Sequence, residues 1–315
     1  MKIVVTGALG HIGSRVIREI PAFFPGSEVV MIDNLITQRY CSLYDLPREG
    51  KYRFVEANIL DVNLKELIKG ADVVLHLAAI TDAAGSFQNK EYVEHNNYTA
   101  TVKVAMACAD MGCSLIYISS TSVYGTQNAV VDENCSSREL RPQSPYAETK
   151  LREEKFLQDF GDKKKLRFLI FRFGTIYGIS PGMRFHTAVN KFCWQAVMGR
   201  PLSVWRTALF QKRPYLALSD AARAIEFVIK NNLFDQKIYN VLTENLTVDE
   251  VIREIKKYIK HLDVQYVDVE IMNQLSYEVS TSRFMEKGFT FKGSIEKSIS
   301  ETIEKIKRAG GTHVG

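Results

Sequence analysis

The chain has 315 residues, of which 46% are hydrophobic and 24% are charged, and its net charge at pH 7 is +5. This composition is ordinary for a folded protein with a core, and the length allows one large α/β domain or two modest ones. No apolar run reaches the roughly 20 residues that a membrane helix needs, so we expect no membrane partner. The small positive charge does not indicate a ligand by itself, and we expect no nucleic acid.

Cellular location is predicted from the N-terminus and the cysteines. The first residues, MKIVVTGALG, pass directly into a strand and a turn without a signal peptide. Five scattered cysteines form no C-x-x-C pair, which favours reduced thiols in the cytoplasm and gives no reason to expect a bound metal.

Short apolar runs alternate with helix-like segments through the first half of the chain. The runs are near-continuously apolar and bounded by turn residues, which is typical of central parallel strands. Strands are predicted at 2–6, 28–32, 52–55, 72–77, 114–118 and 168–171, and helices at 14–20, 63–68, 96–111 and 147–160. The alternation predicts an α/β fold with a Rossmann-type doubly wound parallel sheet.

The pattern changes after residue 178. The segment 178–213 is less regular and contains one helix, and a further strand is predicted at 238–242. A helix at 248–261 should begin with a capping box of Thr247 and Glu250. The last helix carries isoleucines on one stripe, at positions 295, 299, 303 and 306.

These patterns predict two interleaved domains. A nucleotide-binding Rossmann domain is expected to comprise residues 1–178 with a returning portion at about 214–242. A smaller α/β substrate-binding domain is expected to comprise residues 179–213 and 243–315.

A glycine-rich turn separates the first strand from the first helix. Gly7, Gly10 and Gly13 allow a tight turn and bring backbone close enough for a pyrophosphate to bind at the helix N-terminus. Three glycines could also make a simple turn, but Asp33 ends the second strand at the spacing of a ribose-binding acid. A carboxylate there suits a ribose 2′-hydroxyl and repels a 2′-phosphate, which favours NAD over NADP.

Two more strand ends are candidates for the same ligand. Asp61 follows the third strand and is predicted to meet the adenine end. The sequence HLAA ends the fourth strand with small residues, where a cofactor could lie against backbone. His76 in this sequence is interpreted as a hydrogen-bonded core histidine rather than a catalyst.

Hydroxyl side chains follow the fifth strand in the sequence SSTSVYG, at residues 119–125. Tyr146 and Lys150 are four residues apart at the start of a predicted helix, and therefore on one face. A neighbouring ammonium favours the phenolate and could make Tyr146 a base near neutral pH. The spacing Tyr-x-x-x-Lys also occurs by chance on helix surfaces, so the pair gains weight only from its place after the other motifs.

Taken together, the motifs resemble the extended short-chain dehydrogenase/reductases, in particular the nucleotide-sugar epimerases and dehydratases. The resemblance covers residues 1 to about 220, with a further similar stretch at 280–289. It is carried by TGALGHIG, MIDNL, NILDV, HLAA, NNYTATVKV, SSTSVYG, PYAETK, RFGTIYG, KRPYLALSD and STSRFMEKGF.

The resemblance implies a role for each matching residue. Tyr146 is the acid/base, Lys150 steadies it and the nicotinamide ribose, and Ser120 binds the reacting sugar oxygen. The residues implied to bind NAD, besides Tyr146 and Lys150, are Gly7, Gly10, His11, Ile12, Gly13, Asp33, Asn34, Ile59, Asp61, Leu77, Ala78, Ala79 and Asn97. The residues implied to bind substrate are Thr81, Ser120, Thr121, Ser122, Thr175, Arg184 and Arg213.

The strand end at 120–122 discriminates between reactions of this family. Dehydratases and decarboxylases of the family carry acids there, and the related GDP-fucose synthases carry a cysteine where Ser122 stands. This chain has only hydroxyls, which favours an NAD-dependent epimerase of a nucleoside-diphosphate sugar, acting at C4 through a 4-keto intermediate. The alternatives are a nucleotide-sugar reductase or dehydrogenase and, less favoured, a dehydratase or a non-catalytic NAD-binding protein.

Some substrate residues keep alternative interpretations. Arg213 matches a phosphate-binding arginine, but it could be an ordinary surface residue. Arg184 could supply a second phosphate contact, or it could cap the helix together with His186. His186 could instead be a second acid, which would fit a reductase or a 3- or 5-epimerase. Thr175 stands where many relatives have an asparagine. By resemblance, we also expect a homodimer through the helices at 96–111 and 147–160.

Overall fold

The computed structural model describes residues 1–81, 85–125, 130–136, 138–268 and 276–308. Its centre is a sheet of seven parallel strands in the order β11-β7-β5-β4-β1-β2-β3. The strands are β1 (Lys2–Thr6), β2 (Glu28–Asp33), β3 (Lys51–Glu56), β4 (Val73–His76), β5 (Ser114–Ser120), β7 (Phe168–Phe173) and β11 (Ile238–Val241). The predicted doubly wound parallel sheet is confirmed, and all seven predicted strands belong to it.

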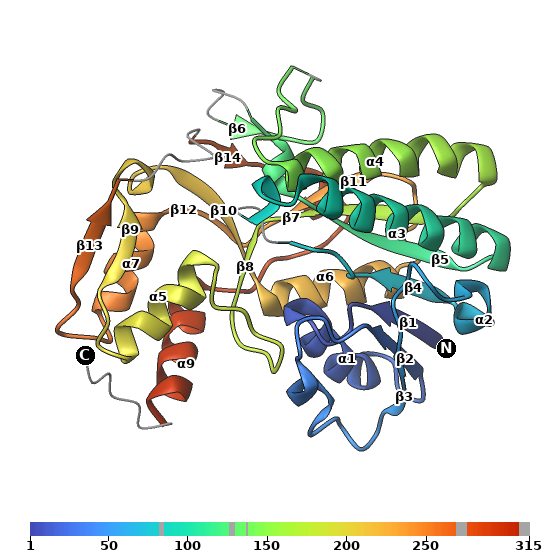
Figure 1. Cartoon of the computed structure of the whole chain (residues 1–315), viewed down its shortest axis with the longest axis horizontal. Helices are drawn as coiled ribbons and strands as arrows, with labels where there is room; N and C mark the ends of the chain where they lie inside the picture. Colours follow the sequence, from blue (N-terminus) through green and yellow to red (C-terminus); the bar gives the residue numbers. More distant parts are fainter. Residues whose placement is uncertain (82–84, 126–129, 137, 269–275, 309–315) are drawn as a thin grey trace.

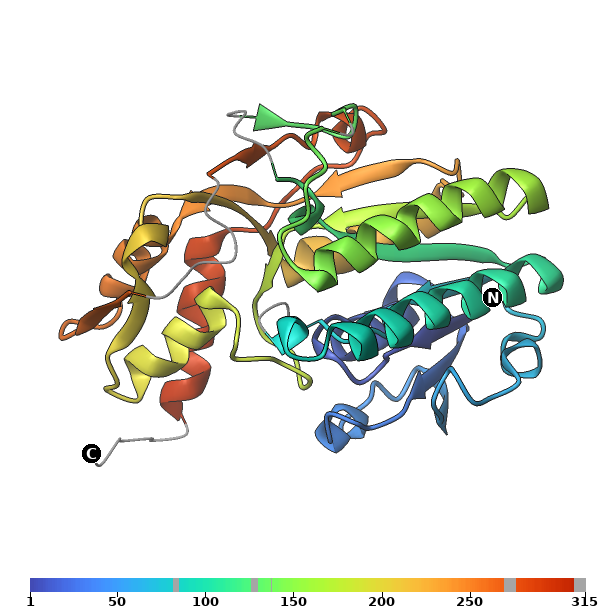
Figure 2. The same cartoon turned by 45° about the horizontal axis from the view of Figure 1, so that its top comes forward.

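Helices cover both faces of this sheet (Figure 1). Helices α1 (His11–Phe23) and α6 (Leu218–Lys230) pack on one face, and α2 (Leu64–Ile68), α3 (Lys90–Met111) and α4 (Pro145–Lys164) pack on the other. Helices α3 and α4 lie side by side in both Figure 1 and Figure 2. Helix α3 begins six residues before its predicted start, because Val93 in the added turn is buried.

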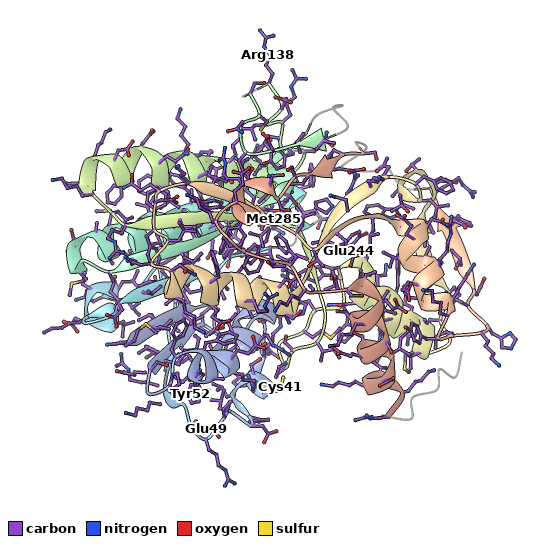
Figure 3. All side chains as sticks on the ribbon, turned by 180° about the vertical axis from the view of Figure 1, so that it is seen from behind. Cys41, Glu49, Tyr52, Arg138, Glu244 and Met285 are labelled. Carbon is purple, nitrogen blue, oxygen red and sulfur yellow. The ribbon has the colours of Figure 1, made fainter. Side chains whose placement is uncertain are left out.

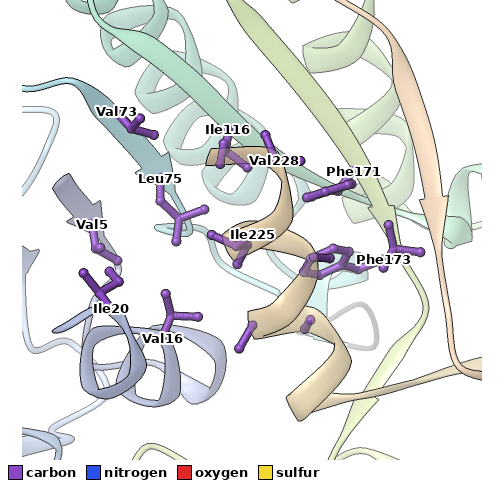
Figure 4. Close-up of a cluster of buried hydrophobic side chains, with 14 of the residues drawn as sticks. Val5, Val16, Ile20, Val73, Leu75, Ile116, Phe171, Phe173, Ile225 and Val228 are labelled. Atoms are coloured by element: carbon purple, nitrogen blue, oxygen red, sulfur yellow. The ribbon is translucent and has the colours of Figure 1, made fainter. Parts of the chain in front are cut away.

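The main sheet has a hydrophobic core on each face. Alternate residues of each strand belong to the two cores, because successive side chains of a strand point to opposite faces. On β1, Val5 packs toward α1 and α6, whereas Val4 packs toward the helices of the other face. Figure 4 shows the first core, in which Val16 and Ile20 of α1 and Ile225 of α6 meet the strand side chains. Burial on both faces explains why these strands are almost entirely apolar.

A second lobe lies at the left of Figure 1. It contains a three-stranded sheet, a two-stranded sheet and three helices around their own core. These elements are β8 (Thr175–Tyr177), β10 (Lys212–Ala217) and β12 (Glu244–Thr247), β9 (Leu202–Trp205) and β13 (Val264–Val267), and α5 (Ala188–Val197), α7 (Val248–Lys256) and α9 (Ile295–Arg308). Helix α8 (Ser282–Met285) packs against the main sheet through Phe284. A further pair, β6 (Val130–Val131) and β14 (Glu278–Val279), packs in a small cluster with Val123, Tyr124 and Leu242.

Two predictions about this lobe are confirmed. The capping box of Thr247 and Glu250 is present at the start of α7, although the helix ends at Lys256 rather than at residue 261. The isoleucine stripe of α9 is buried at Ile295, Ile299 and Ile303. The side of α9 that faces the core is therefore the one that the spacing predicts.

The chain crosses between the two regions more than once, and polar contacts join them. The Cys41 thiol donates to the Pro181 carbonyl at 3.3 Å, and the Ser180 hydroxyl donates to the His11 carbonyl at 2.8 Å. Figure 3 labels Cys41 and Glu244 near this junction. Among the residues that the structure describes, no helix is both long and apolar enough to cross a membrane.

Candidate active site

The glycine-rich turn lies where β1, β4 and α1 approach one another. Gly7 has a φ of +66°, and a Cβ at this position would lie 2.7 Å from the Ala78 backbone nitrogen. A Cβ at Gly13 would lie 2.5 Å from the Gly7 carbonyl oxygen. Helix α1 begins directly after Gly10, which offers no side-chain cap to its first N–H groups. Only glycine permits this approach, and it leaves helix N–H groups open to an anionic ligand.

Asp33 ends β2 beside this turn and is held by two backbone amides. Its Oδ2 accepts from the Leu9 amide and its Oδ1 from the Leu35 amide, each at 3.0 Å. Each carboxylate oxygen retains a lone pair that can accept from a hydroxyl group. The side chain is therefore oriented and still able to bind a ribose.

A cavity of about 530 Å³ opens at the carboxyl end of the sheet. It lies where the strand order reverses between β1 and β4, which is where ligands bind in doubly wound sheets. The predicted residues that line it are Gly7, Gly10, His11, Ile12, Gly13, Asp33, Asn34, Ile59, Leu77, Ala78, Ala79, Thr81 and Arg184. Other residues that line it were not predicted from the sequence. Thr37, Arg39 and Tyr92 lie outside the quoted motifs, whereas Asn58 and Asn96 lie within NILDV and NNYTATVKV without having been singled out.

These residues fit a dinucleotide such as NAD. The side-chain-free backbone of the glycine turn suits a pyrophosphate, and the carboxylate of Asp33 suits ribose hydroxyls. The small residues Ala78 and Ala79 leave room beside the β4 end. The cavity volume also lies within the roughly 300–1,000 Å³ range of small-ligand sites.

Two predicted cofactor residues, exposed Asp61 and buried Asn97, do not line the cavity. After β3 the chain turns, and the Asp61 carboxylate accepts from the Asn58 side-chain amide at 2.8 Å, so that Asn58 reaches the wall and Asp61 does not. The Asn97 amide is occupied by Ile80, accepting from its N–H at 2.8 Å and donating to its carbonyl at 2.9 Å. The structure thus gives both residues a supporting position, and direct contact with the cofactor stays a prediction.

Two histidines near the cavity are buried and hydrogen-bonded. His11 donates from Nε2 to the Gly178 carbonyl at 2.8 Å, and burial lowers its pKa to about 4. His76 contacts Thr6 through Nδ1 at 2.7 Å and Thr101 through Nε2 at 3.4 Å. Burial, followed by the charge of Lys150, lowers the pKa of His76 to about 3. Both rings are therefore neutral near pH 7, and the interpretation of His76 as a core histidine is confirmed.

The hydroxyl cluster follows β5 as a short 3-10 turn, Thr121–Val123. Ser120 caps this turn, because its Oγ accepts from the Ser122 amide at 3.1 Å and from the Ser122 hydroxyl at 2.9 Å. The Thr121 hydroxyl is buried and donates to the Phe173 carbonyl at 3.3 Å. Of the three, Ser120 and Ser122 are only half-buried, so they are the better placed to meet a ligand.

Tyr146 and Lys150 lie on successive turns at the start of α4. Ser144 caps the helix through the Ala147 amide at 3.2 Å, and Lys150 Nζ lies 5.9 Å from the centre of the Tyr146 ring. Burial raises the pKa of Tyr146, whereas the charge of Lys150 lowers it. Lys150 is itself only 4% exposed. In this arrangement the buried ammonium of Lys150 can assist the ionisation of the Tyr146 phenol.

Of the predicted substrate residues, Arg184 is the one with the most informative position. Its guanidinium contacts the Thr81 hydroxyl across the cavity opening, and its charge lowers the pKa of Tyr146. This contact does not support the alternative in which Arg184 caps α5. Exposed His186 lines the same cavity.

Thr175 and Arg213 lie apart from that cavity. Thr175 begins β8 and pairs with Tyr215 of β10, so it occupies the three-stranded sheet. Half-buried Arg213 donates to the Lys212 carbonyl at 3.0 Å and to the Gln211 side chain at 2.6 Å. Its guanidinium also lies 5.7 Å from the centre of the Tyr277 ring. Arg213 is therefore not an ordinary exposed arginine, although its role toward substrate stays a prediction.

The fold and cavity define a Rossmann-type dinucleotide-binding protein with a Tyr–Lys pair beside its site. The family model described as the NAD dependent epimerase/dehydratase family matches residues 3–241. The chain belongs to this family, as the resemblance predicted.

Known relatives include both epimerases and dehydratases. The chain is 33% identical over 239 residues to an uncharacterized UDP-glucose epimerase, YtcB, of Bacillus subtilis, covering 73% of this chain and 72% of the relative. It is 27% identical over 320 residues to the dTDP-D-glucose 4,6-dehydratase of Bos taurus, covering 96% and 88%.

The solved structures agree in fold. UDP-glucuronic acid 4-epimerase from Bacillus cereus, solved with UDP-glucuronic acid and NAD, superposes with a TM-score of 0.89 at 25% identity, covering 98% of this chain and 100% of the other. MoeE5, solved with UDP-glucuronic acid and NAD, gives a TM-score of 0.84 at 26% identity with the same coverage.

Proposed function

We propose that this protein is an NAD-dependent 4-epimerase of a nucleoside-diphosphate sugar, with Ser120, Tyr146 and Lys150 as its catalytic residues. The observation that carries the proposal is the hydroxyl-only strand end beside the Tyr–Lys pair. Ser120 and Ser122 present hydroxyls at the end of β5, and α4 carries the phenol and ammonium. Membership of the family and the 4-epimerases among the similar structures support it.

In this mechanism Tyr146 moves the proton and the hydroxyls hold the sugar. Ser120 hydrogen-bonds the oxygen at C4, and the Tyr146 phenolate accepts the proton of that hydroxyl. Bound NAD would supply the hydride acceptor and donor for C4, and the glycine turn and Asp33 would hold it. After the 4-keto sugar has rotated in the site, Tyr146 gives the proton back to the oxygen at C4. The reaction is redox-neutral, so one bound cofactor serves every turnover.

The absence of a carboxylate at 120–122 separates this reaction from dehydration. Dehydration removes a proton from the carbon next to the keto group and a hydroxyl from the carbon beyond it, which needs a second acid/base group at the sugar in addition to the phenol. Thr121 and Ser122 are too weakly acidic near pH 7 for that task. A net reductase would use the same three residues but would have to exchange its cofactor in every cycle.

The test is turnover without added cofactor. We expect the purified protein to carry NAD, released on denaturation, and to interconvert C4 epimers of a UDP-sugar, with UDP-glucose and UDP-glucuronic acid as first probes. Consumption of one NADH per sugar converted would contradict the epimerase and favour the reductase. Formation of a stable 4-keto-6-deoxy product would favour a dehydratase.

The second lobe is proposed to bind the substrate. The proposed division is a Rossmann domain at 1–178 and 214–242 and a substrate domain at 179–213 and 243–315. Two separate cores support a division of this kind, although Tyr177, Tyr215 and Ala217 belong to the second core and Phe284 and Phe289 to the first. Arg184 and Thr81 are proposed to contact the sugar or its diphosphate at the cavity opening, and Arg213 the more distant phosphate. A guanidinium can bind a phosphate through two parallel hydrogen bonds.

We also propose a cytoplasmic homodimer. All five cysteines are free thiols, which suits a reducing compartment. Helices α3 and α4 form one layer, where a shallow groove is lined by Tyr98, Arg152, Phe156 and Phe160. Light scattering coupled to gel filtration tests the dimer, and a Phe156→Glu variant should become monomeric if this groove is the interface.

A further inference from the structure

A buried carboxylate lies directly behind the Tyr–Lys pair. Glu153 follows Lys150 by three residues on α4, and its side chain is fully buried, with 0% exposed. Its Oε2 lies 3.3 Å from Lys150 Nζ and accepts from the Tyr117 hydroxyl at 2.5 Å. Its Oε1 accepts from the Thr101 hydroxyl at 2.6 Å. Strand β5 and helix α3 thus each contribute one donor to this carboxylate.

The hydrogen-bond directions around Glu153 are consistent with an ionised carboxylate. Because Thr101 donates its proton to Glu153, it must accept from His76, whose Nε2 lies 3.4 Å away. His76 Nδ1 then accepts from Thr6. His76 is neutral, with one proton to give, because its pKa lies at about 3. From Thr6 through His76 to Thr101, each group therefore donates its proton to the next group on the way to Glu153.

Lys150 is bound on the same side. Its ammonium donates to the Tyr117 oxygen at 3.0 Å and lies 4.7 Å from the centre of that ring. Tyr117 is fully buried, so the ammonium and the carboxylate share a water-poor pocket. The two opposite charges compensate each other there, whereas a buried ammonium without a carboxylate partner would carry an uncompensated charge.

The same carboxylate acts on Tyr146. Burial has the largest effect on the pKa of Tyr146 and raises it. The charge of Lys150 lowers this pKa, the charge of Glu153 raises it, and the charge of Arg184 has a smaller lowering effect. Glu153 and Lys150 therefore have opposite effects on the phenol. The charged and titratable groups around this cluster are Lys150, Glu153 and Glu154 of α4, Tyr117 of β5, His76 of β4, Arg172 of β7 and Arg184 of the segment before α5.

We propose that Glu153 is a positioning residue of the active site, which holds the Lys150 ammonium against Tyr117 and partly cancels its charge at Tyr146. The inference rests on the proposed function, since it assigns Glu153 a task in the proton transfer of Tyr146. An epimerase needs one phenol both to take a proton and to give it back. Glu153 thereby limits how far the Lys150 ammonium can lower the pKa of the phenol, and acid/base catalysis is most effective when that pKa lies near the working pH.

The test removes the charge of Glu153 and follows Tyr146. In Glu153→Gln, the acidic limb of the pH profile of kcat/KM should move to lower pH by about one unit. The tyrosinate absorbance of the NAD-bound protein without substrate should move by the same amount. The Tyr146 signal is isolated by subtracting the spectrum of the matching protein with Tyr146→Phe. The proposal would be overturned if the acidic limb of the kcat/KM profile and the tyrosinate titration stayed at their wild-type pH or moved to higher pH.

Matched variants separate charge from packing. Glu153→Asp keeps the charge and should keep the wild-type titration, and so should Tyr117→Phe, which removes a hydroxyl but no charge. Glu153→Met removes the charge with an apolar side chain of similar length and should shift the titration as the glutamine does, even if Glu153→Gln does not fold. An equal shift in the charge-keeping variants would also contradict the proposal.

The design distinguishes two kinds of failure. A shifted tyrosinate titration in a protein that converts no nucleotide sugar would contradict the epimerase function and leave the coupling of Glu153 to Tyr146 intact. Active wild-type protein with an unmoved titration in Glu153→Gln and Glu153→Met would contradict the role of Glu153 alone.

Discussion

Arg172 on β7 and Glu154 on α4 form a two-pronged ion pair in the interior of the protein. Arg172 Nε lies 2.9 Å from Glu154 Oε1, and Nη2 lies 2.6 Å from Oε2. Both residues are at most 2% exposed. Ser119 on β5 also donates to Glu154, at 2.5 Å. The helix that carries Tyr146 and Lys150 is therefore anchored to two central strands.

Breaking this pair should destabilise the protein strongly. Arg172→Met leaves the Glu154 carboxylate buried without its partner, which costs about 3–5 kcal/mol. The control is Arg152→Met, because Arg152 pairs with Glu94 from an exposed position on the same helix. Such surface pairs contribute about 0–1 kcal/mol. Urea unfolding of the two variants measures the difference, and equal losses of stability would contradict the anchoring role.

Removing the phenol of Tyr146 should abolish most of the proton transfer. In Tyr146→Phe we expect kcat to fall by about 10²–10⁴-fold, the usual contribution of a general acid/base. The amount of co-purified NAD should not change, because the ring remains. Tyr98→Phe is the control, since Tyr98 lies in the α3–α4 groove away from the cavity. Wild-type activity in Tyr146→Phe would require another acid/base group.

Asp33 should determine how tightly NAD is held. Asp33→Asn replaces a charged acceptor by an amide, which can no longer accept through both of its ends. We expect NAD to dissociate at least about tenfold more readily, because hydrogen bonds to charged groups are worth about 1.5–3 kcal/mol. Calorimetric titration of the cofactor-free protein measures this affinity.

Asp61→Asn is the matched comparison for Asp33→Asn. In the wild type the Asp61 carboxylate binds Asn58, which lines the cavity, but Asp61 itself does not line it. The loss of NAD affinity in Asp61→Asn should therefore be smaller. An equal loss in the two variants would show that Asp61 contacts the cofactor directly, as the sequence alone suggested.

The buried neutral histidines should make the fold sensitive to acid. Burial lowers the pKa of His11 in the folded protein to about 4, below its ordinary value of 6.5. Between these pH values the unfolded chain binds more protons than the folded one, so the free energy of unfolding falls as the pH falls. His11 alone should contribute about 3 kcal/mol of this loss.

A substitution of His11 provides the measurement. In His11→Gln the slope of the unfolding free energy between pH 6.5 and 4 should be smaller than in the wild type. His95→Gln is the control, because His95 is exposed. The assignment to His11 would be wrong if both variants kept the wild-type slope.

Much of the fold could be predicted because its signals are local. Strands buried on both faces require continuous apolar runs, and these runs located the seven strands of the main sheet. The lobe around α5 and α9 was predicted less completely. Its strands β9 and β12 are only four residues long, β12 is half-buried throughout, and the partners of both strands are distant in the sequence.

The sequence by itself determined the glycine turn, Asp33, the hydroxyl cluster and the Tyr–Lys spacing, because each follows from the residue types allowed at one turn or one helix face. The tertiary structure alone decided which neighbours complete the site. It placed Asn58 at the cavity wall with Asp61 bound to it outside the lining, and brought Arg184 to Thr81 in the same cavity. It also placed Glu153 in a pocket formed by three separate elements. Contacts of this kind depend on how strands and helices pack, and no local pattern of residues encodes them.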